Sequence, residues 1–133
     1  SLRDSSLLQY EWLGDFDEAM IKLFAKNPKF MRDEVREMSI DNGSKIMIFS
    51  RGDFLFAINL HWMQSYVDWP IVVPPGSYEL RLNTDSPEFG GQGRIAEDQV
   101  FHTIPTIVSN EQINNIYVYL PARTAMVLSR VKS

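Results

Sequence analysis

The sequence contains no cysteine, no apolar run long enough to cross a membrane and no excess of positive charge. Without cysteine the chain can form no disulfide, thiolate nucleophile or cysteine–zinc site, and this absence fits a reducing compartment such as the cytoplasm. The longest apolar run, residues 54–58, is far shorter than the roughly 20 residues that a membrane span requires. Acidic residues outnumber basic ones by 17 to 13, which disfavours binding to nucleic-acid phosphates. We therefore expect no membrane span and no nucleic-acid partner.

Histidine is scarce as well. The two histidines, His61 and His102, have no partners at the spacing of a metal site, and no Gly-x-Ser-x-Gly motif marks a nucleophile. We expect structural or surface histidines, no bound metal and no cofactor. Residues 1–4 lack an initiator methionine, a basic start and an apolar stretch, which predicts a piece of a longer protein without a signal peptide.

The chain has enough apolar residues for one globular domain, since hydrophobic residues make up 44% of its 133 positions. Its first part has a helical pattern. Asp15 and Glu18 have the spacing of a capping box, and Pro28 ends the pattern. One apolar stripe recurs between them at helical spacing: Phe16, Met20, Leu23 and Phe24. We interpret residues 1–30 as a helical segment that docks on another body, because short helices cannot form a core alone.

From about residue 35, short apolar stretches alternate with turn residues. Asn42-Gly43 predicts a hairpin turn because both residues tolerate a positive φ, and Gly52 suits the first central position of a type II′ turn. These signals predict an antiparallel β-sandwich over residues 31–133, not an α/β fold. Strands are expected over residues 35–40, 45–51, 54–60, 66–73, 78–83, 100–108, 113–120 and 124–131.

The hairpin of residues 46–58 is apolar on both faces. Strands of an antiparallel sandwich usually alternate, with one face in water, but residues 46–49 and 54–58 do not. We infer that something covers the second face, and that the helical segment and an absent neighbouring domain share this role.

Three further motifs have ordinary structural explanations. Residues 51–53 spell Arg-Gly-Asp, an adhesion tripeptide, but they suit a hairpin tip. Residues 89–94 are rich in glycine but lack the Lys-Ser/Thr of a phosphate loop, so we expect a tight loop from which Arg94 could reach an anion or a carboxylate of a neighbouring domain. Asp68 and Asp85 are the carboxylates to watch for glycoside chemistry, although turn capping explains them better.

Three aromatic residues, Trp62, Tyr66 and Trp69, lie close together in the sequence. Exposed aromatic faces stack on sugar rings, so the group predicts a carbohydrate platform. The alternative is packing in the core or against a neighbouring domain, as is common for large aromatics. We favour packing, although the spacing does not decide between the two.

A series of segments follows one another in an order that is typical of one family. Residues 49–61 end in Asn-Leu-His, and residues 65–69 read Ser-Tyr-Val-Asp-Trp. The chain resembles the C-terminal region of 1,4-α-glucan (glycogen) branching enzymes, of the α-amylase superfamily. Leu60, Trp62 and Trp69 depart from it, since the family usually has Phe, Pro and Tyr there. The other similar segments are residues 8–20, 75–78, 82–85, 88–91 and 121–128.

The resemblance implies an all-β C-terminal domain preceded by the last helices of a catalytic barrel. The parent enzyme would cleave an α-1,4 glucan with retention and transfer the chain to a 6-hydroxyl, using two carboxyl groups on barrel strand ends. The family's catalytic motifs belong to that barrel, so we assign no catalytic residue in this chain.

The role that the resemblance implies is to pack against the missing barrel and stabilise it, in glycogen or starch synthesis. The side chains expected to pack there are Phe16, Met20, Phe54, Phe56 and Arg94. Those expected to contact α-glucan are Trp62, Tyr66 and Trp69. The alternatives are a stand-alone α-glucan-binding module, the C-domain of another α-amylase-superfamily enzyme, and an adhesion module that uses residues 51–53.

Overall fold

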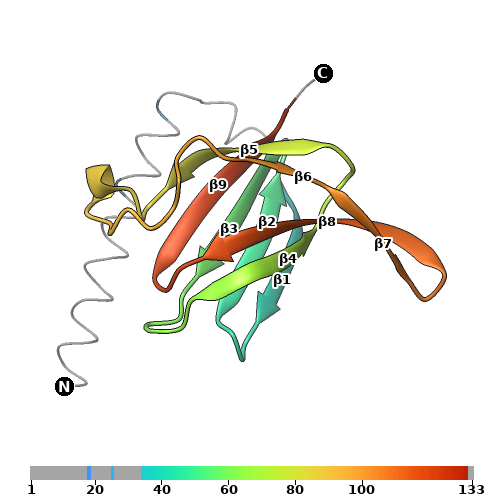
Figure 1. The fold of residues 1–133 in the computed structure, drawn as a ribbon, viewed down its shortest axis with the longest axis horizontal. Coiled ribbons are helices and arrows are strands. Elements are labelled where there is room, and N and C mark those ends of the chain that lie inside the picture. Colours follow the sequence, from blue (N-terminus) through green and yellow to red (C-terminus); the bar gives the residue numbers. More distant parts are fainter. Residues whose placement is uncertain (1–17, 19–24, 26–33, 132–133) are drawn as a thin grey trace.

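The computed structural model describes residues 18, 25 and 34–131 of the chain (Figure 1). The predicted helical segment, with Phe16 and Met20, therefore lies outside the described residues except at positions 18 and 25. Within residues 34–131 the elements are, in order, β1 (Val35–Asp41), β2 (Ile46–Arg51), β3 (Phe54–Asn59), β4 (Tyr66–Val72), β5 (Ser77–Asn83), the 3₁₀ helix η2 (Pro87–Phe89), β6 (Val100–His102), β7 (Ile104–Val108), β8 (Glu111–Leu120) and β9 (Thr124–Arg130).

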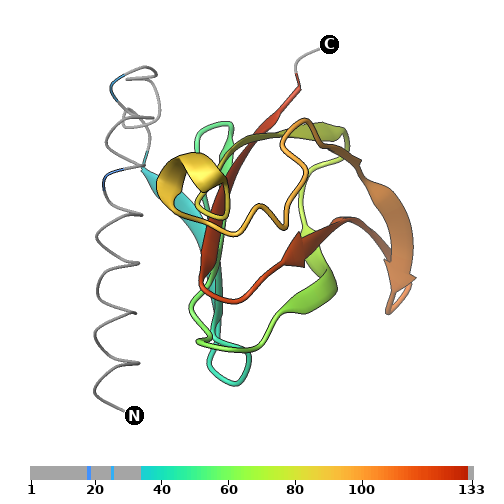
Figure 2. The same cartoon turned by 60° about the vertical axis from the view of Figure 1, so that its left-hand side comes forward.

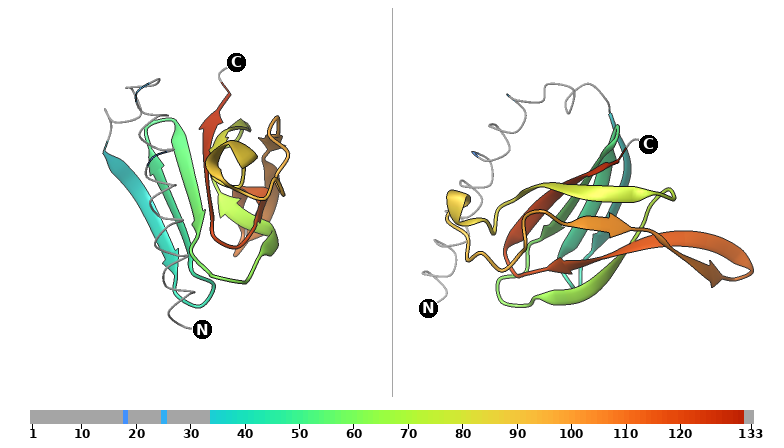
Figure 3. Two further views of the ribbon diagram at one scale, coloured as in Figure 1. Left: turned by 90° about the vertical axis from the view of Figure 1, so that its left-hand side faces the viewer. Right: turned by 45° about the horizontal axis from the view of Figure 1, so that its top comes forward.

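The strands form two antiparallel sheets that face each other. The larger sheet has six strands in the order β1-β2-β3-β9-β5-β6, and the smaller one has three in the order β4-β8-β7. Figure 3 shows these two layers, and Figure 2 shows η2 on the loop between β5 and β6 at one end of them. The predicted antiparallel β-sandwich is confirmed.

A single apolar core fills the space between the sheets. Alternate residues of each strand point inward, as the period of two in a β-strand requires. Burial of each large side chain here contributes roughly 1.5–3 kcal/mol. Inward residues that form this core include Leu55, Ala57, Met126 and Leu128 from the larger sheet and Ile71, Ile116, Val118 and Leu120 from the smaller one.

The first two hairpins were predicted correctly, but one of the two turns differs from its expected conformation. Gly52 has the expected positive φ, 60°. The β1–β2 turn instead has its positive φ at Lys45, 66°, and Asn42 and Gly43 are not among the positive-φ residues. Asp41 Oδ1 accepts the backbone N–H groups of Gly43 and Ser44, at 3.0 and 3.1 Å. The aspartate therefore sets the conformation of this turn, and the predicted role of Asn42-Gly43 is wrong.

The stretch predicted as one strand over residues 100–108 is divided between the sheets. β6 pairs with β5 of the larger sheet and β7 pairs with β8 of the smaller one. The division falls at Thr103, whose N–H donates to Gly76 O at 3.0 Å and whose Oγ1 accepts the Gly76 N–H at 3.0 Å. These two bonds anchor the crossing chain to the β4–β5 turn, a tertiary contact that strand propensity does not report.

Candidate functional site

The outer face of the larger sheet carries a second apolar cluster. Phe54, Phe56 and Val127 are exposed by only 5%, 2% and 0%. Phe49 stacks on Phe56 with ring centroids 4.5 Å apart and planes 5° apart, and Leu82 packs against the same cluster. The β2–β3 ribbon is thus apolar on both faces as predicted, and both faces of β3 are buried.

This outer apolar face continues onto the edge strand β1 and becomes exposed there. Met38 and Ile40 pair with Phe49 and Met47 of β2, so they lie on the outer side with Phe49. Their exposed fractions are 58% and 60%. We call Met38, Ile40, Met47 and Phe49 the β1–β2 rim. The part of this rim on β1 was not predicted, although the alternation of apolar and polar residues over 38–41 carried the signal.

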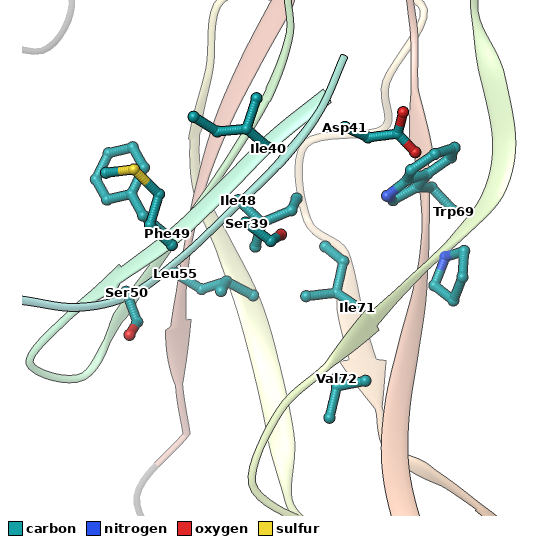
Figure 4. Close-up of a pocket in the computed structure, with 12 residues that line it drawn as sticks. Ser39, Ile40, Asp41, Ile48, Phe49, Ser50, Leu55, Trp69, Ile71 and Val72 are labelled. Carbon is teal, nitrogen blue, oxygen red and sulfur yellow. The ribbon is translucent and has the colours of Figure 1, made fainter. Parts of the chain in front are cut away.

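A groove of about 480 Å³ opens between the edge strands of the two sheets, β1 and β4. Figure 4 shows side chains of both edge strands meeting across it. Trp69 and Ile71 line it from β4, Ser39 and Asp41 from β1, and Leu55 lies between them. The β4 side of the groove is therefore apolar, whereas its β1 side carries polar side chains.

The structure separates the three predicted glucan-contacting aromatics. Tyr66 and Trp69 meet edge to face, with centroids 5.0 Å apart at 63°, and both pack against the inner core. A bulge in β4 with Asp68 at φ 54° places both rings on the same side of the strand. Tyr66 is fixed by its hydroxyl, which donates to Ser44 O at 3.1 Å. Only Trp69 of the three lines the groove.

Trp62 instead lies on the β3–β4 loop, where the guanidinium of Arg123 stacks over its ring at 4.4 Å. Two side chains hold this loop. Asn59 Nδ2 donates to Gln64 O at 2.8 Å and to Leu120 O at 3.0 Å. His61 Nδ1 accepts the Gln64 N–H at 2.9 Å and also that of Met63, so the ring proton sits on Nε2. His61 is therefore structural, as expected.

Arg94 and Asp85 form an ion pair within the loop between β5 and β6. The Arg94 Nε and Nη2 atoms lie 2.9 and 2.7 Å from Asp85 Oδ1, and Asp85 is 1% exposed at its side chain. Arg94 Nη2 also donates to Ala122 O at 3.1 Å, which ties the loop to the β8–β9 turn. A Cβ on Gly91 would lie 2.1 Å from Asp85 O, so only glycine fits there. Arg94 therefore pairs with a carboxylate of its own domain, and Asp85 forms this ion pair within the loop between β5 and β6.

The described residues show no catalytic constellation. Arg51, Gly52 and Asp53 occupy the β2–β3 turn, as expected for a hairpin tip. His102 Nδ1 lies 2.7 Å from Ser77 Oγ on the exposed surface. In residues 34–131 no group of three or more acidic or histidine side chains is arranged to hold a metal ion. Within the described part of the chain, no helix has the length and hydrophobicity that a membrane crossing needs.

The two antiparallel sheets of residues 35–130 define an all-β sandwich domain. The family model for the alpha amylase C-terminal all-beta domain matches residues 39–131, so the chain belongs to that family. This confirms the fold class that the resemblance implied.

Comparison with similar proteins shows which members of this family the chain resembles. The chain is 39% identical to the 1,4-alpha-glucan-branching enzyme of Candida glabrata over 98% of its length, and 40% identical to that of Eremothecium gossypii over 98%. It is 37% identical to the Saccharomyces cerevisiae enzyme over 97%. The chain spans only 18–19% of the length of these relatives. The predicted resemblance to branching enzymes is confirmed, and it covers a small part of each of them.

Proposed function

We propose that the chain is the non-catalytic C-terminal domain of a 1,4-α-glucan branching enzyme, and that its larger sheet docks on the catalytic barrel of that enzyme. The parent enzyme transfers α-1,4 chains to 6-hydroxyl groups of glucan. The names of the relatives and the match over nearly the whole chain support this assignment. The chemistry belongs to the barrel, so this domain acts by stabilising the barrel.

The observation that carries the proposal is the outer apolar face of the larger sheet. A β-sandwich that contacts no other domain keeps the outer faces of its sheets polar, because exposed apolar area is unfavourable in water. Here the face is apolar from Val127 to the β1–β2 rim, and Met38 and Ile40 at its edge are more than half exposed. A barrel surface seated on this rim would remove both side chains from water. Phe54 and Phe56 lie on the same face but are already only 5% and 2% exposed within this chain, so the proposed contact with the barrel is made by the rim.

For the compartment we propose the cytoplasm. The absence of cysteine suits a reducing environment, whereas the similar Arabidopsis thaliana protein is named as chloroplastic and amyloplastic.

A domain exchange tests the docking proposal. The C-terminal region of the Saccharomyces cerevisiae enzyme is replaced by this chain, and branching is followed by the fall in iodine absorbance of amylose. We expect an active chimera. Ile40→Asp in the chimera should then lower activity and thermal stability strongly, because an unpaired carboxylate buried in an apolar contact costs several kcal/mol.

Ile107→Asp serves as the matched control, because Ile107 is 74% exposed and lies on β7 of the other sheet. It should leave the chimera unchanged. In the 133-residue chain alone, Ile40→Asp should shift the free energy of unfolding by about 0.5 kcal/mol or less. If both substitutions affect the chimera equally, the β1–β2 rim is not the docking surface.

A further inference from the structure

The groove between β1 and β4 has two walls of different chemistry. The β4 wall is apolar, formed by Trp69 and Ile71. The β1 wall carries Ser39 and Asp41, which pair with Ile48 and Ile46 and therefore face the groove (Figure 4). An aromatic wall opposite hydroxyl and carboxylate groups suits a ligand that has apolar C–H faces and polar edges.

The polar groups of the groove have bonding capacity left for a ligand. Asp41 uses Oδ1 for the two turn N–H groups, and its Oδ2 accepts no hydrogen bond from another described residue. The hydroxyls of Ser39 and Ser50, which also line the groove, likewise make no side-chain hydrogen bond within residues 34–131. Two hydroxyls and one carboxylate oxygen can therefore serve a ligand rich in hydroxyl groups.

The groove does not suit an added β-strand on its β4 side. Pro70 has no N–H to donate, and the bulge with Asp68 at φ 54° interrupts the ladder. The inward residues of β1 are polar, so the groove also lacks the apolar pair of walls that would clasp a peptide. Its volume, about 480 Å³, falls in the range of small-ligand sites, about 300–1,000 Å³.

We propose that this groove binds a short stretch of α-1,4-linked glucan, with a glucose ring stacked on Trp69 and its hydroxyl edge facing Ser39, Asp41 and Ser50. The choice of this ligand rests on the proposed function, while the chemistry of the walls rests on the structure. The site would hold a glucan chain beside the β1–β2 rim, since Met38, Ile40 and Phe49 of the rim also border the groove.

Binding is measured with the 133-residue chain and maltoheptaose, by calorimetry and by tryptophan fluorescence. We expect saturable binding that Trp69→Ala weakens about three- to tenfold, because the stacked ring is lost. Trp62→Ala is the matched control, since Trp62 does not line the groove, and it should change the affinity less than twofold. Cellohexaose, which has β-1,4 links and a flatter shape, should bind more weakly than maltoheptaose.

A second variant keeps the test decisive if Trp69→Ala does not fold, since Trp69 also packs on the core. Ser39→Val removes one hydroxyl from an exposed strand and should lower the affinity about two- to fivefold. The proposal is overturned by no binding at millimolar maltoheptaose, by equal binding of cellohexaose, or by loss of binding in Trp62→Ala with both groove variants unaffected. An active domain-exchange chimera would leave the docking function standing in each of these cases.

Discussion

The outer faces of the two sheets differ in how deeply their apolar side chains are buried. In the larger sheet, β3 and β9 are buried on both sides, and Phe56 and Val127 on the outer side are exposed by 2% and 0%. In the smaller sheet, Val72 of β4 and Ile104 of β7 lie on the outer side and are exposed by 60% and 54%. The centre of the larger sheet is therefore buried on its outer side, whereas the smaller sheet exposes large apolar side chains on its outer side at β4 and β7.

Because of this difference, the two sheets suit different roles, docking on a partner and binding a ligand. The larger sheet offers an apolar face that continues to an exposed rim, which suits a rigid partner. The smaller sheet contributes Trp69 to a groove at the open edge of the sandwich. The two proposed sites meet at β1, whose outward residues Met38 and Ile40 belong to the rim and whose inward residues Ser39 and Asp41 face the groove.

The largest expected effect tests the difference in burial directly. Phe56→Ala should lower the free energy of unfolding of the chain by about 3–5 kcal/mol, because it removes a buried ring and leaves a cavity. Ile104→Ala, on the outer side of the smaller sheet, should cost less than about 1 kcal/mol. Urea unfolding of the two variants measures both values. Similar losses in the two variants would mean that the outer faces do not differ.

The double burial of β3 could be predicted from the amino-acid sequence for a physical reason. A strand that is covered on both sides shows no alternation of apolar and polar residues, and residues 54–58 have none. The same local reasoning located the turn at Gly52, whose positive φ is a property of one residue.

Contacts between distant residues were not predictable in this way. Asp85 and Arg94 both stood out in the sequence, yet their pairing depends on the close approach of Gly91 to the backbone of Asp85. Trp69 stood out as well, but the opposite wall at Ser39 depends on the order of strands, which places β1 and β4 at the same open edge. The crossing of the chain between the sheets at Thr103 also depends on a contact between distant residues, the two hydrogen bonds to Gly76.

The second prediction concerns the buried charge. Among the described residues, Asp85 is the one buried carboxylate, and it lies two residues after the end of β5 of the larger sheet. Arg94→Met should lower the free energy of unfolding by about 2–3 kcal/mol. This estimate lies below that for a fully buried pair because Arg94 is itself 26% exposed. Thermal unfolding gives the value.

The double variant Asp85→Asn with Arg94→Met is the matched control for this charge. It removes the carboxylate together with its partner and should recover part of the loss, since no unpaired charge stays buried. A double variant that is less stable than Arg94→Met alone would contradict this account.

The smallest expected effect is a dependence on pH in the same sheet. Tyr78 of β5 is 4% exposed, and its hydroxyl donates to Pro74 O at 2.7 Å. Burial raises the pKa of Tyr78 above its ordinary value of 10.0, and the nearby Arg130 partly opposes this shift.

The unfolded chain therefore loses the Tyr78 proton at a lower pH than the folded chain. The resulting stabilisation is complete below pH 10 and declines as the pH rises through the raised pKa of the folded state. Tyr78→Phe should cost about 1 kcal/mol at neutral pH through the lost hydrogen bond, and the gap to the unaltered chain should narrow above pH 10. Urea unfolding at a series of alkaline pH values measures that gap. A constant gap across the series would show that ionisation of Tyr78 is not coupled to folding, and that the inner side of the larger sheet does not hold this phenol in its neutral form.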